Sequence, residues 1–149
     1  MASEPREVFG DLATTAFVES SVLFRSLEAD ARADLLQVGH LLGFSAGEIV
    51  SPPGDDGFYI VRDGSAAALA EGPSGPVELY RLERGAFFGV GRALGNPRAA
   101  WLEARSEVTV VTFPALVIGA LAERFPKVKK LLETVLAARE RDASERLAS

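Results

Sequence analysis

The side chains that could carry out chemistry are limited in type. The sequence of 149 residues has no cysteine and a single histidine, His40. These counts exclude thiolate zinc sites, cysteine nucleophiles, disulfide scaffolds and multi-histidine metal sites. No nucleophile–base pair, glycine-rich P-loop or carboxylate pair with a stated role is present either. We therefore expect a protein that is not an enzyme and that needs no metal or cofactor.

Apolar residues recur at helical spacing at both ends of the chain. From about Phe9 to Leu42 they return every three or four residues, which favours helices. The same spacing resumes at Pro114, and Phe125-Pro126 divides it, because proline suits the first turn of a second helix. One face of that second helix carries a stripe made of Val128, Leu131, Leu132, Val135 and Leu136.

The middle of the chain has the pattern of short strands. Apolar runs alternate there with clusters rich in glycine and proline, which argues for an antiparallel sandwich or barrel. The runs are 48–50, 58–61, 77–80 and 108–111, and the turn clusters are 51–57, 63–64, 72–76 and 95–97. We expect one α+β domain, mainly β, over residues 1–149. It consists of an antiparallel β-roll or jelly roll (44–113) flanked by N-terminal helices (1–43) and C-terminal helices (114–146).

Seven short motifs follow one another along this pattern. They are Leu23-Phe24-Arg25-Ser26-Leu27, Phe44-Ser45-Ala46-Gly47-Glu48-Ile49-Val50, Gly54-Asp55, Phe58-Tyr59-Ile60-Val61-Arg62-Asp63-Gly64, Gly85-Ala86-Phe87-Phe88-Gly89, Pro97-Arg98-Ala99-Ala100-Trp101 and Phe125-Pro126. Over roughly Val22 to Leu136, the chain resembles the cyclic-nucleotide-binding domains of the catabolite activator protein and protein kinase A regulatory subunit type. The ordered set, rather than any one motif, carries the resemblance.

The resemblance implies a phosphate-binding cassette in residues 85–101. A guanidinium presents paired N–H donors to a cyclic phosphate, and Arg98 stands where the family has its phosphate arginine. Gly89 permits close backbone approach, but Val90 stands in place of the glutamate that binds the ribose, and Ala99 in place of a small hydroxyl residue. The segment 91–96 is also about one residue shorter than is typical. The expected ligand-binding residues are Phe88, Gly89, Val90, Arg98, Ala99 and Ala100.

The missing carboxylate affects the expected affinity. Losing a hydrogen bond to a charged group costs about 1.5–3 kcal/mol, or about 10- to 150-fold in affinity. Ordinary cyclic AMP sensing is therefore disfavoured. A weakly bound cyclic nucleotide or another anionic ligand on Arg98 stays open.

Several residues have a structural interpretation beside a functional one. Arg98 is either a phosphate ligand or a surface arginine in an ion pair, and Arg92 is either a second anion contact or a solvated side chain. Trp101 either stacks on a base or packs in a strand, whereas His40 is expected to be structural. Turn or core roles are expected for Glu48, Asp55, Phe58 and Tyr59.

The charge pattern bears on the partners. With 21 acidic and 16 basic residues the net charge is −5, which disfavours nucleic acid. The one basic cluster, made of Arg124, Lys127, Lys129 and Lys130, is expected to be a solvated helix face. The helix 126–138 either forms the seam of a homodimer or caps the roll, since its stripe is short for a coiled coil.

These observations favour a non-catalytic, stand-alone regulatory module that signals through protein–protein interaction. The alternative is a ligand-responsive sensor of bacterial type that binds a cyclic nucleotide or other small anion through Arg98. A transcription regulator is disfavoured, because no recognition helix follows the C-terminal helices. No signal peptide and no apolar stretch of about 18 residues are seen, so we expect a cytoplasmic protein without membrane contact.

Overall fold

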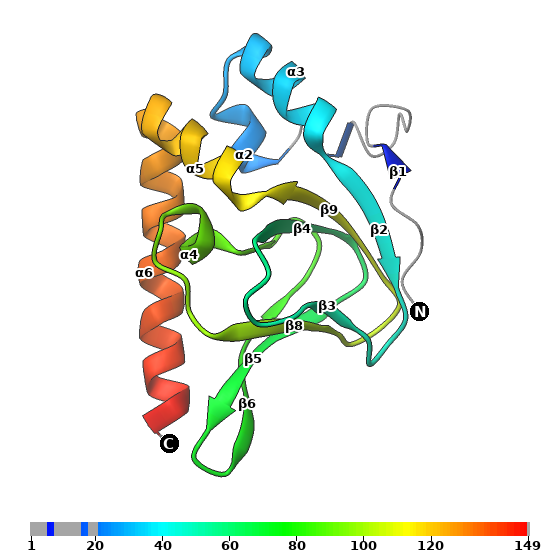
Figure 1. Ribbon diagram of the computed structural model, residues 1–149, viewed down its shortest axis with the longest axis vertical. Helices are drawn as coiled ribbons and strands as arrows, with labels where there is room; N and C mark the ends of the chain where they lie inside the picture. Colours follow the sequence, from blue (N-terminus) through cyan, green and yellow to red (C-terminus); the bar gives the residue numbers. More distant parts are fainter. Residues whose placement is uncertain (1–5, 8–15, 18–20, 149) are drawn as a thin grey trace.

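The structure is a computed structural model, and it describes residues 6–7, 16–17 and 21–148 (Figure 1). The helices are α2 (Val22–Arg25), α3 (Ala29–Val38), α4 (Val90–Ala93), α5 (Ala115–Arg124) and α6 (Pro126–Ala148). The strands are β1 (Arg6–Glu7), β2 (His40–Phe44), β3 (Ile49–Ser51), β4 (Gly57–Asp63), β5 (Ala66–Gly72), β6 (Gly75–Leu82), β7 (Phe87–Phe88), β8 (Ala100–Ala104) and β9 (Val108–Pro114). Of the segment predicted to be helical from about Phe9 to Leu42, residues 9–15 and 18–20 lie outside the described residues.

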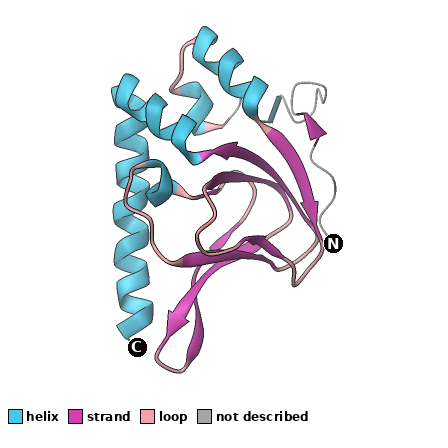
Figure 2. Ribbon diagram, viewed as in Figure 1, coloured by secondary structure: helices cyan, strands magenta, loops and turns pink. Residues whose placement is uncertain are grey.

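The strands form two antiparallel sheets, which confirms the predicted β-roll with flanking helices (Figure 2). One sheet has the order β1-β2-β9-β4-β7 and the other the order β3-β8-β5-β6. The helices gather on one side of the roll, and α6 runs along it for most of its height (Figure 1). The fold therefore places one long helix along the side of the roll.

Side chains alternate between two cores along the central strands. In β4, Tyr59 and Val61 belong to the core between the sheets, whereas Phe58 and Ile60 belong to the core under the helices. Both faces of this strand are buried, which explains why its sequence is a continuous apolar run. The second core also holds Phe24 of α2, whose ring lies 6.0 Å from that of Phe113 in β9.

The first long strand begins earlier than predicted. Helix α3 ends at Val38, and β2 starts at His40, within the segment whose spacing favours helix. Leu35 and Leu42 are seven residues apart, which fits two helical turns, yet they lie on different elements. Pairing of β2 with β9 over five residues overrides the local pattern.

A close contact with α5 holds α4 in place. A Cβ on Gly119 of α5 would lie 2.3 Å from the carbonyl oxygen of Ala93, so only glycine allows this approach.

The apolar stripe of α6 packs inside the chain, with Val128 and Leu132 fully buried under α5. The stripe therefore caps the roll in this structure.

Candidate functional site

The short helix α4 begins where the chain makes its tightest approach to β4. Gly89 has φ +103°, and a Cβ there would lie 2.6 Å from the carbonyl oxygen of Gly57. A side chain is therefore excluded on two grounds, the backbone conformation and the space. This turn fixes the direction in which α4 leaves the roll.

Val90, the first residue of α4, points into the core. Its side chain is 2% exposed and belongs to the apolar cluster under the helices. An aliphatic side chain there offers no hydrogen bond to a ligand. The position at which the family resemblance expects a carboxylate is therefore part of the packing.

A pocket lies between α4, β6, β8 and α6. It encloses about 60 Å³. Its lining contains five of the six expected ligand-binding residues, namely Phe88, Gly89, Val90, Arg98 and Ala100. Ala99 is exposed and is not part of the lining. The remaining walls come from Leu79, Tyr80, Gly91, Arg92, Asn96, Leu136, Arg139, Glu140 and Ala143.

Arg98 reaches this pocket from its exposed rim. Its side chain makes no hydrogen bond or ion pair with any residue that the structure describes. Of the two interpretations of Arg98, the surface ion pair is therefore not what is seen. Among the described residues, the Arg98 guanidinium is exposed and lines the pocket.

Arg92 is held by the protein itself. Its Nη1 donates to the hydroxyl of Ser51 (2.7 Å) and to the carbonyl of Gly57 (3.1 Å), and it lies 3.6 Å from a carboxylate oxygen of Asp55. The side chain is only 9% exposed. Of the two interpretations of Arg92, the solvated side chain is wrong, because β3 and the β3–β4 turn supply partners that are far away in sequence. Arg92 fastens α4 to that turn.

Asp55 is the centre of this network. Its carboxylate accepts hydrogen bonds from Ser51 (3.0 Å), Tyr59 (2.5 Å) and the backbone N–H of Gly57 (3.3 Å). Burial alone would raise the pKa of Asp55, but these hydrogen bonds and the charge of Arg92 outweigh it and hold the pKa below 3.8. Burial and the bond to Asp55 raise the pKa of Tyr59 to about 12. The turn role predicted for Asp55 is confirmed.

The sequence analysis did not select Arg139, which enters the pocket from α6. Its Cζ lies 4.4 Å from the centre of the Tyr80 ring, a cation–π distance. Its Nη1 is buried and has no hydrogen-bond partner among the described residues. Burial lowers the pKa of Arg139 and raises that of Tyr80.

A signal for this part of α6 was present in the sequence. Leu136, Ala143 and Leu147 are spaced by seven and four residues, so they continue the apolar stripe beyond Ala138. Ala143 is 1% exposed and packs with Ala70, Leu79 and Ala100. The charged residues between them conceal the pattern.

A side-chain hydrogen bond also joins α6 to the cassette. Asn96 Nδ2 donates to Glu140 Oε1 over 3.1 Å. Asn96 and Glu140 both line the pocket, so this contact joins two of its walls.

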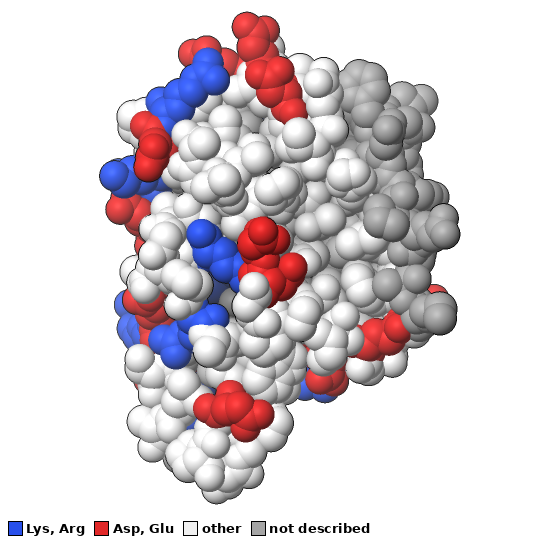
Figure 3. Space-filling model, viewed as in Figure 1, with Lys and Arg blue, Asp and Glu red and all other residues white. Residues whose placement is uncertain are grey.

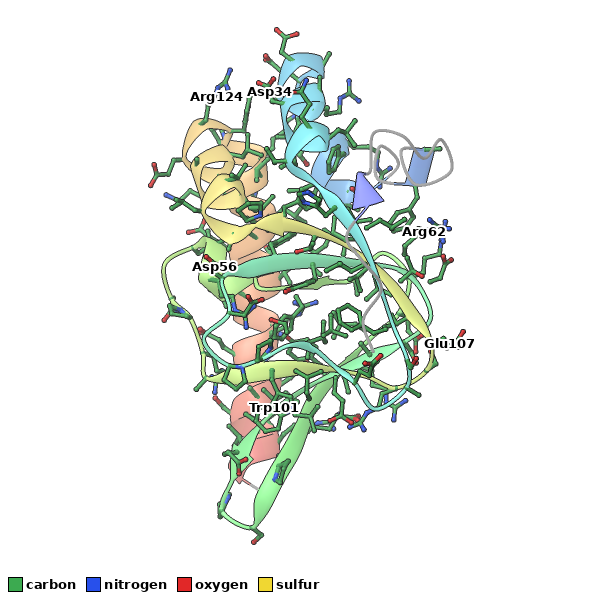
Figure 4. The ribbon with its side chains drawn as sticks, turned by 45° about the vertical axis from the view of Figure 1, so that its right-hand side comes forward. Asp34, Asp56, Arg62, Trp101, Glu107 and Arg124 are labelled. Carbon is green, nitrogen blue, oxygen red and sulfur yellow. The ribbon has the colours of Figure 1, made fainter. Side chains whose placement is uncertain are left out.

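The remaining candidates lie away from the pocket. Figure 4 shows Trp101 on β8 and Arg124 at the opposite end of the molecule, near α3. Trp101 is half-buried, whereas His40 is exposed on β2 and so is not a core histidine. Glu48 accepts a hydrogen bond from the Ser45 backbone (2.7 Å), which confirms its turn role.

The four residues of the basic cluster are exposed. Figure 3 shows acidic and basic side chains interspersed along the edge formed by α6.

A profile described as "cyclic nucleotide-binding domain" matches residues 41–125. This chain belongs to that family.

Among its described residues, no three His, Asp or Glu side chains cluster in a way that could hold a metal ion. Within the same residues, no helix has the length and apolarity required to cross a bilayer.

Three known proteins illustrate the similarity. The chain is 32% identical over 99 residues to a cAMP-dependent protein kinase regulatory subunit of Mucor circinelloides f. lusitanicus, which covers 64% of this chain and 23% of the relative. The regulatory domain of Toxoplasma gondii PKA with cAMP superimposes with a TM-score of 0.69, at 25% identity, over 83% of this chain and 48% of that one. The sensor domain of the transcriptional regulator DNR from Pseudomonas aeruginosa has a TM-score of 0.73 at 16% identity, over 92% and 95%. The chain thus spans about a quarter of its curated relative and about half of the Toxoplasma domain.

Proposed function

We propose that this chain is a non-catalytic regulatory domain that acts through contact with a protein partner and does not bind cyclic nucleotides in the usual manner of its family. Regulation is the shared element of the relatives' names, one a kinase regulatory subunit and the other a sensor domain of a transcriptional regulator.

The observation that carries the proposal is the state of the pocket. Val90 lies buried in the core where the family's ribose ligand is expected, and only about 60 Å³ is open between α4 and α6. Sites for drug-sized ligands enclose about 300–1,000 Å³. A cyclic nucleotide would have to displace Arg139 from Tyr80 and would find no carboxylate for its ribose.

An exposed leucine supports protein contact. Leu116, near the start of α5, is 85% exposed and borders a hollow lined by Ala93, Leu94 and Gly119. A large apolar side chain on such a rim gains free energy when a partner covers it. The apolar stripe of α6 is already covered inside the chain, so a homodimer through 126–138 would need other residues of that helix.

A second candidate function follows from Arg98. Its guanidinium lies at the rim of the pocket, which favours a sensor of small anions. In such a sensor, binding of the anion would change the contact with a protein partner.

The experiment is affinity capture with the immobilised chain, in the absence and presence of about 1 mM cyclic AMP, a concentration at which a ligand with a Kd of 10 μM would be saturating. We expect the same partner to be retained in both conditions and lost with Leu116→Glu. Ile49→Glu, at another exposed apolar position, is the control and should retain it. A partner released by cyclic AMP, or the absence of any partner that depends on Leu116, contradicts the proposal.

A further inference from the structure

The pocket beneath α6 contains a cation whose hydrogen bonds are incomplete. Arg139 is anchored by its contact with Tyr80, yet its buried Nη1 finds no acceptor within the described part of the chain. A buried donor on a charged group without an acceptor is costly, and such groups in folded proteins are usually paired. The described residues therefore leave one donor of Arg139 open to an acceptor that they do not supply.

A second cation faces the same space. Arg98 lines the pocket from its exposed rim and has neither an ion pair nor a hydrogen bond among the residues described. Arg92 also lines the pocket, but its donors are engaged by Ser51 and Gly57. Two guanidinium groups, from the α4–β8 loop and from α6, are thus available to one ligand.

The charge around the pocket is opposite to that of the whole chain. The lining contains three arginines and one acidic residue, Glu140, whose Oε1 accepts a hydrogen bond from Asn96. The chain as a whole has a net charge of −5. Cations that gather at one hollow of an acidic protein attract an anion there.

The volume limits the size of that anion. About 60 Å³ are open here, well below the 300–1,000 Å³ of sites that hold drug-sized ligands, so an ion of a few atoms suits the space better than a larger molecule does. A phosphate or sulfate ion has five non-hydrogen atoms, and its oxygens match the paired donors of a guanidinium. A nucleotide is several times larger.

We propose that the pocket between α4, β6 and α6 binds a small tetrahedral oxyanion of the phosphate or sulfate class, with Arg139 and Arg98 as its ligands. The inference deepens the second candidate function, because it names the ligand class and adds the ligand from α6. The bound anion accepts from Nη1 of Arg139 and links α6 to the cassette. Retention of a protein partner is a separate property, so the capture experiment can fail without affecting this site.

The test is an NMR titration of the full chain, labelled with ¹⁵N, with sodium phosphate and with sodium sulfate at constant ionic strength. Backbone signals of the cassette and the Nε–Hε signals of the arginines locate the ligand. We expect saturable shifts at Arg139, Arg98 and Gly89, with a Kd of about 1 mM or below. Arg139→Gln and Arg98→Gln should each weaken binding about tenfold or more.

Arg141→Gln is the matched control, since Arg141 is exposed on the same helix and does not line the pocket. It should bind as the unaltered chain does. Arg98→Gln keeps the test valid if Arg139→Gln fails to fold, because Arg98 is exposed. Shifts that do not saturate, or that are equal in all three variants, overturn the proposal.

Two further ligands separate the sources of the oxyanion. If glycerol phosphate binds as tightly as inorganic phosphate, the ligand is a phosphomonoester. If glycerol phosphate binds more weakly than inorganic phosphate, the ligand is the free ion. Cyclic AMP that binds to the same residues about tenfold more tightly than phosphate overturns the assignment to a small ion.

Discussion

Single residues determine what the cassette can bind. Val90 offers only an aliphatic side chain to the core, whereas Arg98 and Arg139 offer guanidinium donors to the pocket. The site therefore has cations without the carboxylate that a ribose hydroxyl would need. This combination favours a small anion over a nucleotide.

Restoring the carboxylate should damage the fold and should not create a nucleotide site. Val90→Glu buries an unpaired charge, so we expect the free energy of unfolding at pH 7 to fall by about 3–5 kcal/mol. Burial raises the pKa of the new carboxyl in the folded state. The loss should therefore shrink as the pH falls towards about 4.3, the ordinary value for glutamate.

Denaturant unfolding at pH 7 and at pH 4 measures this effect. Val90→Ala, which leaves a cavity without a charge, should show a loss that does not depend on pH. If Val90→Glu is stable at pH 7 and is stabilised further by cyclic AMP, the side chain at position 90 faces a ligand and our interpretation of the core is wrong.

Asp55 should contribute stability that depends on pH. Its pKa lies below 3.8 in the folded protein, so the charged form is stabilised by folding. That contribution is present above the unfolded pKa and is lost as the pH falls through the folded pKa. We expect Asp55→Asn to cost about 1–3 kcal/mol at pH 7, because three hydrogen bonds to a carboxylate are altered.

The measurement is denaturant unfolding at pH 7 and at about pH 3, below the ordinary pKa of aspartate. The difference in the free energy of unfolding between the unaltered chain and Asp55→Asn should be smaller at the lower pH. Asp56→Asn, at the exposed neighbouring position, should change little at either pH. If Asp55→Asn lowers the free energy of unfolding equally at both pH values, the charge of Asp55 does not contribute to stability.

The role of a residue could be predicted from the sequence where its hydrogen-bond partners are near in the chain. It could not be predicted where the partners are distant. The turn roles of Glu48 and Asp55 depend on neighbours within four residues, and both were predicted. Arg92 meets Ser51 and Gly57 across at least 35 residues, and local sequence does not indicate that contact. The role of a charged residue in a loop-rich fold is therefore set by topology.

Among the elements, α6 has the largest influence on the site. Its first half is fixed under α5 by Val128 and Leu132, and its second half lies on β6 through Ala143. The second half depends on fewer buried side chains. We infer that it is the part of the helix that separates first from the roll.

Ala143→Glu should detach that second half. The substitution places a carboxylate in a fully buried position against Leu79, which is unfavourable without a partner. We expect amide protection in residues 139–148 to fall about tenfold or more, while residues 126–136 keep theirs. Hydrogen exchange read by mass spectrometry or NMR gives both values.

Arg141→Glu is the control, because position 141 on the same helix is exposed. It should leave protection unchanged in both halves. Equal loss of protection along the whole of α6 in Ala143→Glu would mean that the helix separates as one unit.

The elements themselves were predictable where a pattern was both periodic and punctuated. The four apolar runs between turns became β3, β4, β6 and β9. β5 was not predicted, because Ala66–Gly72 is rich in alanine, which favours helix. Its strand form comes from pairing with β6 and β8 on both sides.

At the scale of the molecule, the fold consists of a roll of two antiparallel sheets and one long helix packed along it. The same architecture occurs in a kinase regulatory domain and in the sensor domain of a transcriptional regulator. Fold alone therefore does not determine the ligand or the partner. In this chain, our proposals on the ligand and the partner rest on the small pocket, on Arg98 and Arg139 in its lining, and on the buried Val90.

The most direct test of the account is the thermal unfolding of the chain with cyclic AMP and with cyclic GMP at about 1 mM each, a hundred times a Kd of 10 μM. We expect the midpoint to change by less than about 1 °C with either nucleotide, since binding is too weak to stabilise the fold. A ligand with a Kd of about 10 μM would stabilise the protein by about 2.7 kcal/mol and raise the midpoint by about 5–10 °C. A rise of that size with either nucleotide would contradict the account and would identify the chain as a cyclic nucleotide sensor.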